Sequence, residues 1–379
     1  MDEHRSVIVV GAGIIGLTTA WELVEEGWDV TLCDPEPGMG ASRAAAGMLA
    51  AIAEVTWDQS ALYPLMVASG RAWPELAARV EAAVGHPVGY LPVETLVCAG
   101  DAADRQALAD LADLQHSLGM EIESITPSAA RRLEPALGPG VVGAMRIPTD
   151  HQVDPRVFMA ALLELLTPRA TLVRRRVTAL TRQDDRVVGV RLEDGTLLAA
   201  DEVLVTAGLD AGAIEGLPPS LRLPLRPVRG DIIRVRVPER LRPLLTRTVR
   251  GIVHGFPVYL VPRADGTMVI GATSREDDLA GPSAGGIYQL LRDAQRLVPG
   301  VLECEVYEVL ARPRPGSPDD VPLVGRLGPG LTLSTGYFRH GILLAALGAR
   351  LAADLVAGRT PAPDVAAGVD PYRFSEVTA

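Results

Sequence analysis

Three glycines near the N-terminus have the spacing of a site that binds the phosphates of a dinucleotide. Gly11, Gly13 and Gly16 occupy the G-x-G-x-x-G positions directly after the apolar run 7–10, which we expect to be a buried parallel strand. Gly11 would permit a tight turn, Gly13 the close approach of backbone to a pyrophosphate, and Gly16 the packing of a helix against the strand. The pattern therefore predicts a strand, turn and helix that hold a dinucleotide.

Two amides and one acid complete the expected nucleotide site. Ile14 and Ile15 open the helix, where free N–H groups and the helix dipole favour a negatively charged pyrophosphate. Asp34 ends the next apolar strand, residues 30–33, where a carboxylate can accept hydrogen bonds from an adenosine ribose. The alternative is a βαβ unit whose glycines only form a tight turn. Such a turn would accept alanine at position 13, so it does not explain Gly13. We therefore expect dinucleotide binding, with NAD an alternative on this motif alone.

A tract of small residues follows the acid and is the second candidate for ligand contact. It reads PEPGMGASRAAAGMLA from residue 35 and ends near Glu54. Alanines and glycines in series let the backbone approach a flat ligand, and each of its glycines would weaken a helix by about 1 kcal/mol. The alternative is an alanine-rich helix with Ser42 as its N-cap. We favour ligand contact.

Composition narrows the class of protein. The 379 residues suit about two domains, and the net charge of -11 argues against nucleic acid as a partner. The sequence contains no lysine, so its 36 lysine-or-arginine positions are all arginine. This excludes a Schiff-base lysine and a P-loop lysine. Three isolated cysteines and six dispersed histidines suggest neither a disulfide framework nor a metal site, so we expect no metal, no membrane span and a cytoplasmic, reducing setting.

Hydrophobic periodicity predicts an α/β fold in which one sheet domain is inserted into another. We expect helices over residues 60–84, 101–118, 156–166 and 284–297. A β-meander from residue 177 would feed a buried strand at 203–206, antiparallel strands would cover 225–273, and a last strand at 331–335 would be followed by a helix from Gly341. The nucleotide domain would then comprise residues 1–80, 150–220 and 310–379. Residues 81–149 and 221–309 would form the substrate domain, built on an antiparallel sheet.

Four segments together resemble the D-amino-acid oxidase superfamily of FAD enzymes, and within it the glycine oxidases of bacterial thiamine biosynthesis. They are VIVVGAGIIGLTTAWEL, ASRAAAGMLAAIAE, VYLVPRADGTMVIGAT, and ARPRPGSPDDVPLVGR with TGYFRHGILLAA close behind. The resemblance implies an FAD-binding Rossmann-like domain of glutathione-reductase type, and an antiparallel sheet that covers the flavin. No cysteine falls in a motif that contacts the flavin, so we expect FAD to be bound noncovalently.

The resemblance also implies the substrate site. Arg314 falls where these enzymes place the arginine that pairs with the substrate carboxylate, a task that suits a planar guanidinium with two parallel donors. Arg312 lies two residues away on the same strand face and is the alternative. Tyr259 matches the active-site tyrosine, and Arg339 matches an arginine near the flavin and the substrate carboxylate.

The same resemblance implies a set of residues around the cofactor. The helix after Gly341 is aimed in this family at the flavin C2 carbonyl, where negative charge gathers on reduction. The implied cofactor residues are Gly11, Gly13, Ile14, Ile15, Gly16, Asp34, Ser42, Ala46, Gly47, Met48, Val177, Ala207, Gly208, Arg339, His340, Gly341, Ile342 and Leu343.

Three departures from the family pattern lie near the expected pocket. Pro257 replaces a frequent histidine, Ser274 a methionine, and His340 the usual asparagine. His340 could act on oxygen reactivity or flavin charge, but we favour a structural role in which it caps the following helix or hydrogen-bonds a carbonyl.

The implied reaction is oxidative deamination of glycine or another small amine, such as sarcosine or D-alanine, to a keto acid, ammonia and hydrogen peroxide. Oxygen would reoxidise the flavin, and the glycine imine or glyoxylate would serve thiamine biosynthesis, with hand-off to a thiazole synthase and a homo-oligomer as further expectations. We expect no obligatory general base, because no pocket carboxylate is evident from the sequence. The alternatives are a D-amino-acid or proline dehydrogenase with another electron acceptor, and a nucleotide-binding protein without turnover.

Overall fold

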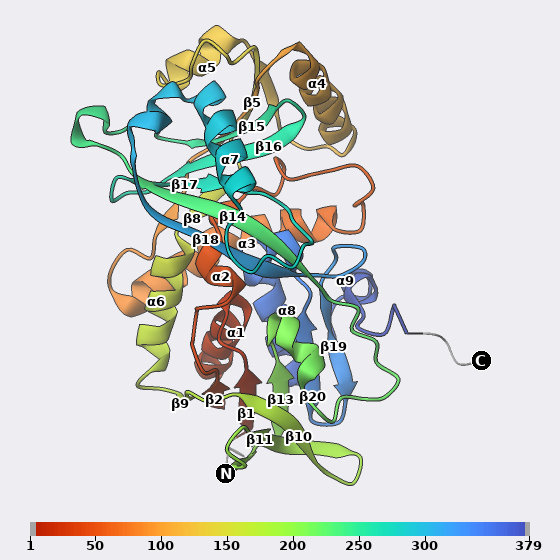
Figure 1. Ribbon diagram of the computed structural model, residues 1–379. Helices are drawn as coiled ribbons and strands as arrows, with labels where there is room; N and C mark the ends of the chain where they lie inside the picture. The colour runs from red at the N-terminus through yellow and green to blue at the C-terminus, as the bar shows by residue number, and fades with distance from the viewer. Residues whose placement is uncertain (1–4, 376–379) are drawn as a thin grey trace.

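A mixed, mainly parallel sheet forms one half of the molecule. The computed structural model describes residues 5–375, and this sheet lies in the lower half of Figure 1. In spatial order its strands are β19 (Leu323–Gly328), β20 (Leu331–Thr335), β13 (Glu202–Val205), β1 (Ser6–Val10), β2 (Asp29–Cys33) and β9 (Thr171–Val173). Only the β19–β20 pair is antiparallel. Residues 7–10 are apolar throughout because both faces of this sheet are covered.

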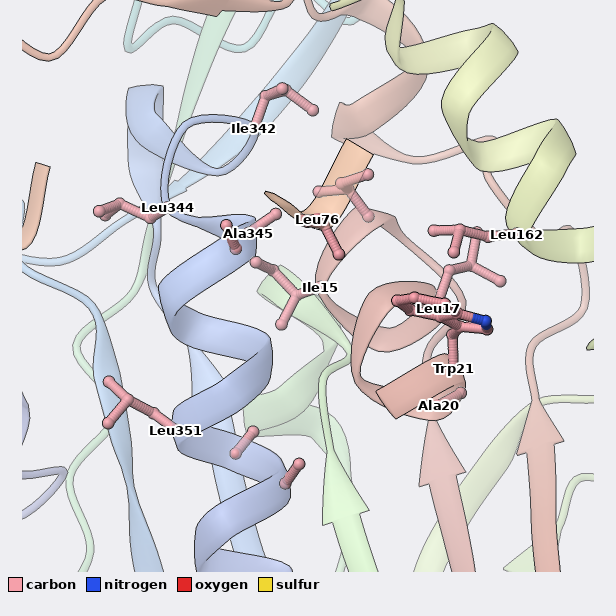
Figure 2. Close-up of a cluster of buried hydrophobic side chains, with 14 of the residues drawn as sticks. Ile15, Leu17, Ala20, Trp21, Leu76, Leu162, Ile342, Leu344, Ala345 and Leu351 are labelled. Carbon is pink, nitrogen blue, oxygen red and sulfur yellow. The ribbon is translucent and has the colours of Figure 1, made fainter. Parts of the chain in front are cut away.

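Helices cover one face of this sheet. They are α1 (Ile14–Glu25), α3 (Tyr63–Val84), α6 (Pro155–Leu166) and α8 (Ala345–Val356). Val7 and Val9 of β1 point into the core that these helices form, in which the Trp73 and Phe158 rings lie 5.0 Å apart. Figure 2 shows side chains of α1 and α8 facing each other in this core. Because α1 is packed on several sides, the turn that precedes it is held rigidly.

A small antiparallel sheet covers the opposite face. Its strands are β10 (Val177–Gln183), β11 (Arg186–Leu192) and β12 (Leu197–Ala199). Ile8 and Val10 of β1 point into the core beneath it, as the two-residue alternation of a strand requires.

An eight-stranded sheet forms the other half of the molecule, in the upper part of Figure 1. Its strands in order are β18 (Glu305–Gly316), β14 (Arg226–Arg236), β17 (Thr267–Gly271), β16 (Phe256–Pro262), β15 (Thr248–Val253), β5 (Thr95–Ala99), β7 (Gly143–Ile147) and β6 (Glu123–Ile125). All neighbouring pairs are antiparallel except β15 with β5. Helices α4 (Ala102–Ser117), α5 (Pro127–Leu133) and α7 (Ala284–Leu297) pack against this sheet.

Short elements join the two halves. Strands β3 (Met48–Leu49), β8 (His151–Val153) and β4 (Tyr90–Leu91) form a second small sheet, and α2 (Ala41–Ala44) and α9 (Pro363–Val369) are brief helices. The 3-10 helices are η1 (Gly208–Ala213), η2 (Glu239–Leu241), η3 (Pro299–Glu303) and η4 (Phe338–His340). No helix among residues 5–375 is long and apolar enough to cross a bilayer.

The α/β class and the expected helices are confirmed, with two local corrections. The helix expected from Gly341 begins at Ala345, because the chain after η4 first makes a turn in which Leu344 donates to the His340 carbonyl and Ala345 to that of Ile342. The proposed domain boundaries at residues 80 and 310 fall inside α3 and β18, which run unbroken to Val84 and Gly316.

Candidate active site

A cavity of about 780 Å³ extends between the two large sheets, and it collects most of the predicted site residues. Those that line it are Gly11, Gly13, Ile14, Ile15, Asp34, Ser42, Ala46, Gly47, Met48, Val177, Ala207, Gly208, Tyr259, Arg314, Arg339, Gly341 and Ile342. Gly16, His340 and Leu343 do not line it. Segments far apart in the sequence therefore meet at one cavity, as the motifs predicted.

The three motif glycines serve different purposes in the structure. Gly11 has a φ of +102°, and a Cβ there would lie 2.7 Å from the Thr206 carbonyl oxygen. A Cβ on Gly16 would lie 1.9 Å from the Gly11 carbonyl oxygen, so this glycine permits contact between turn and helix rather than ligand binding. A Cβ on Gly13 would find only the Ser42 hydroxyl, at 3.4 Å. The protein itself has room for a side chain at Gly13, so the requirement for glycine points to whatever occupies the cavity.

Asp34 and Ser42 organise the nucleotide end of the cavity. The Asp34 carboxylate accepts the amide of Ala12 at 2.7 Å and that of Glu36 at 2.8 Å, which fixes its position at the end of β2. The Ser42 hydroxyl accepts the Ile14 amide at 3.1 Å, so this amide is not free as the motif suggested. The alternative role for Ser42 is wrong: α2 is four residues long, begins at Ala41, and has no side-chain cap.

The rest of the small-residue tract is extended chain held by buried arginines that the sequence did not reveal. Arg234 on β14 donates to the carbonyls of Arg43 and Ala45 at 3.3 Å each, and Arg263 donates to that of Ala46. A Cβ on Gly47, whose φ is +77°, would lie 1.9 Å from the Val153 carbonyl oxygen. These contacts hold this part of the tract at the cavity wall, and its contact with a flat ligand stays a prediction.

Tyr259 and Arg314 lie on the face of the eight-stranded sheet that borders the cavity. A Cβ on Gly271 would meet the Tyr259 hydroxyl at 2.5 Å, and one on Gly230 would meet the Arg314 guanidinium at 2.1 Å. Glycines on the neighbouring strands therefore let both side chains lie flat over the sheet. Burial raises the pKa of the Tyr259 hydroxyl, and the nearby Arg314 acts in the opposite direction.

Arg314 has the environment of an anion-binding group. Its guanidinium donates to the Thr273 carbonyl at 3.3 Å, and within the described residues no carboxylate forms an ion pair with it. Burial lowers its pKa, as expected for a cation that lacks a partner. Arg312 lines the same cavity but is exposed, and it donates to the carbonyls of Met39 and Ala311.

A buried carboxylate, Glu54, also lines the cavity, so the expectation that the pocket has none is wrong. Glu54 is 7% exposed, and its Oε1 accepts a bond from Arg250 at 2.5 Å and lies 3.5 Å from Arg339. Its Oε2 lies 3.4 Å from Nδ1 of His340. Burial alone would raise the pKa of Glu54, but Arg250, His340 and Arg339 outweigh it and hold that pKa well below its usual range. One sequence signal could have revealed the Glu54–Arg250 ion pair. Arg250 is the charged residue of strand β15, whose other residues carry no charge.

His340 faces this carboxylate rather than the cavity. It is 1% exposed, and neither ring nitrogen has a hydrogen-bond partner among the described residues. The structural role favoured for its ring, capping a helix or bonding a carbonyl, is therefore wrong. The other two departures, Pro257 and Ser274, are exposed and line the cavity.

Comparison with known proteins places the chain in a family. The family model described as FAD dependent oxidoreductase matches residues 6–355, and the chain belongs to that family. It is 31% identical over 371 residues to a glycine oxidase of Geobacillus kaustophilus, covering 97% of this chain and 96% of that protein. The crystal structure of glycine oxidase from that organism superposes with a TM-score of 0.87 at 30% identity and covers 98% of this chain and 100% of that chain.

A second kind of relative is longer. The chain is 32% identical over 365 residues to the bifunctional protein ThiO/ThiG of a Nostoc species, which covers 93% of this chain. It spans about half of that relative, 52% of its length. The predicted superfamily and its dependence on FAD are confirmed by the family match.

The residues of this cavity fit FAD. Gly341 and Ile342 line the cavity, and the backbone hydrogen bonds among the described residues give their amides no acceptor. Together with the open space at Gly13, they leave donors and room at both ends of an elongated cofactor. Bound FAD would supply the acceptor of a hydride, and the protein would orient the substrate against it.

Proposed function

We propose that this chain oxidises glycine and other small amines, such as sarcosine and D-alanine, to a keto acid, ammonia and hydrogen peroxide. The observation that carries the proposal is Arg314, a cation without a carboxylate partner, beside Tyr259 in the cavity that continues to the dinucleotide motif. A guanidinium in this setting selects a small anion such as an amino-acid carboxylate. Glycine oxidases of matching length support this substrate class.

We also propose that the glycine imine or glyoxylate feeds thiamine biosynthesis, with hand-off to a thiazole synthase. The bifunctional ThiO/ThiG relatives support this link, because a fusion joins two activities in one chain. A homo-oligomer belongs to the same proposal.

Two alternatives are separated by one assay. A dehydrogenase of the same fold would pass electrons to an acceptor other than oxygen, and an L-proline dehydrogenase from P. horikoshii shares the fold at 21% identity. A nucleotide-binding protein without turnover would have no use for Arg314 and Tyr259. Peroxide formed with glycine under air supports the oxidase, whereas turnover seen only with an added electron acceptor favours the dehydrogenase.

We expect purified protein to be yellow and to release free FAD when it is denatured. Cys33 is the cysteine that lines the cavity, and burial together with Asp34 raises its pKa to about 12. Its thiol is therefore protonated and a poor nucleophile toward a flavin. Absorbance of the supernatant after acid precipitation measures the release. Colour retained in the precipitated chain would contradict the noncovalent cofactor.

We expect glycine to be a substrate, with sarcosine, N-ethylglycine, D-alanine and D-proline turned over at comparable rates. Ser274 is smaller than the methionine that the resemblance to glycine oxidases implies at this place, so the cavity would leave space for a short side chain or an N-alkyl group. One methylene is worth only about 1–3 kcal/mol of discrimination, so glycine itself is not rejected. A peroxide-coupled assay across these amines and the L-amino acids, which we expect to be poor, tests the order. Preference for a bulky D-amino acid or any L-amino acid without glycine turnover would contradict the proposal.

A further inference from the structure

Glu54, which lines the cavity, and His340, which faces Glu54, have no role in the function proposed so far. Glu54 lines the cavity, and its Oε2 lies 3.4 Å from Nδ1 of His340. The imidazole is 1% exposed, and neither of its nitrogens has a hydrogen-bond partner among residues 5–375. Nδ1 has Glu54 as its facing polar group, and Nε2 stays without a partner, which costs free energy in a protein interior.

Charge neutralisation alone does not explain this arrangement. Arg250 donates to Oε1 of Glu54 at 2.5 Å, which supplies one cation for one buried carboxylate. Buried ion pairs add little stability over apolar residues of the same volume, so a further protonatable ring beside this pair is not needed for folding. Oε2, the oxygen that Arg250 does not bind, faces His340, and the Glu54 side chain lines the cavity.

The backbone that carries Glu54 is fixed to an unusual degree. Asp150, which is fully buried, accepts the amides of Ile52 at 3.0 Å and Ala53 at 2.7 Å. The Gln115 amide donates to the Ile52 carbonyl at 2.8 Å. These contacts hold the turn directly before Glu54, so the carboxylate keeps one position relative to the imidazole and the cavity. Such rigidity is what a group that meets a substrate requires.

We propose that Glu54 receives the ammonium group of the incoming amino acid and that His340, acting through Glu54, accepts its proton. The step rests on the proposed function, because it concerns the substrate of that reaction. One N–H bond of the ammonium breaks, and its electron pair stays on nitrogen. The proton passes to the carboxylate and from it to the imidazole, which becomes imidazolium. The neutral amine then has the lone pair that must be available when a hydride leaves its α-carbon.

Charged groups on several elements surround the pair and set the charge of Glu54. The charged or titratable groups that face it are Arg250 on β15, Arg339 beside it on η4, Asp150 before β8, Tyr259 on β16 and Arg314 on β18. The two nearest arginines keep Glu54 ionised, so the carboxylate attracts an ammonium but does not retain the proton. The His340 imidazole faces Oε2 at 3.4 Å and can accept the proton at Nδ1.

The pH dependence of kcat/KM for glycine tests the proposal. With the pair intact, the zwitterion is the substrate, and kcat/KM is level from neutral pH up to the pKa of the free amine. In His340→Asn only the neutral amine reacts, so kcat/KM rises about tenfold per pH unit and meets the unaltered protein at high pH. At neutral pH we expect the variant to be lower by roughly 10²-fold, a usual size for general-base catalysis. Glu54→Gln should show the same change of shape.

Two controls separate this role from a structural one. His116→Asn changes an exposed histidine in the last turn of α4 and should leave the profile unchanged. Acetate carries no amine, so its dissociation constant, measured from the perturbed flavin spectrum, should be equal in the unaltered protein and in His340→Asn. A level pH profile in His340→Asn, or weaker acetate binding equal to the loss in kcat/KM, would overturn the proposal. Absence of glycine turnover at every pH in yellow, unaltered protein would instead reject the proposed function.

Discussion

Gly13→Val should purify as folded protein that contains little or no FAD. The backbone at this position is extended, with φ of -74° and ψ of -175°, so any residue can adopt it. A Cβ would meet only the Ser42 hydroxyl at 3.4 Å, and the two methyl groups of valine would extend into the cavity where the motif places a pyrophosphate. Overpacking costs about 1–3 kcal/mol when neighbours can adjust, and it costs more against a rigid phosphate. The ratio of flavin absorbance to protein measures the loss.

Two other glycines provide the controls for this experiment. Gly212→Val introduces a Cβ that meets nothing within 4 Å and should leave the FAD content unchanged. Gly16→Ala places its Cβ 1.9 Å from a backbone oxygen, so it should lower the melting temperature rather than empty a folded protein. Full FAD occupancy in Gly13→Val would mean that the first motif is only structural.

The parts of the site that could be predicted are those encoded by short spacings. The glycines at positions 11, 13 and 16 act within one turn, and Asp34 ends the neighbouring strand of the same βαβ unit. Arg314 and Tyr259 were placed through motifs that resemble a known family. Their meeting in one cavity follows from strand order, because β18 and β16 belong to one sheet with β14 and β17 between them.

The parts that could not be predicted depend on pairs of residues distant in sequence. Glu54 and Arg250 are separated by 196 positions and meet only because β15 lies against the end of the small-residue tract. Arg234 and Arg263 hold that tract by bonds to its carbonyls, and nothing local in either strand announces such a bond. For His340, the sequence could supply the residue type but not the carboxylate that faces it. Tertiary pairing, rather than spacing, decided the role of each of these side chains.

Arg314 was identified by its motif, and in the structure no carboxylate among the described residues forms an ion pair with it. Replacement of Arg314 should therefore have the second large effect. Arg314→Ala should raise the Michaelis constant for glycine and sarcosine steeply, by about 2–5 kcal/mol of lost binding. The substrate carboxylate would otherwise be buried without a cation, which is costly. FAD content should not change, because Arg314 lies at the substrate end of the cavity, over Gly230 on the sheet. Steady-state kinetics together with the flavin-to-protein ratio measure both quantities.

Arg314→Lys and Arg312→Ala show whether the effect belongs to the guanidinium at this position. Lysine restores the charge but not two parallel donors, so it should recover little of the binding. Arg312 lies on the same strand face and lines the same cavity, but it is exposed and its donors already bind the carbonyls of Met39 and Ala311. Arg312→Ala should therefore change the Michaelis constant only slightly. If Arg312→Ala, and not Arg314→Ala, caused the large loss of substrate binding, the substrate carboxylate would lie two residues away along β18. The guanidinium there is open to solvent, so another feature of the site would have to select small amino acids.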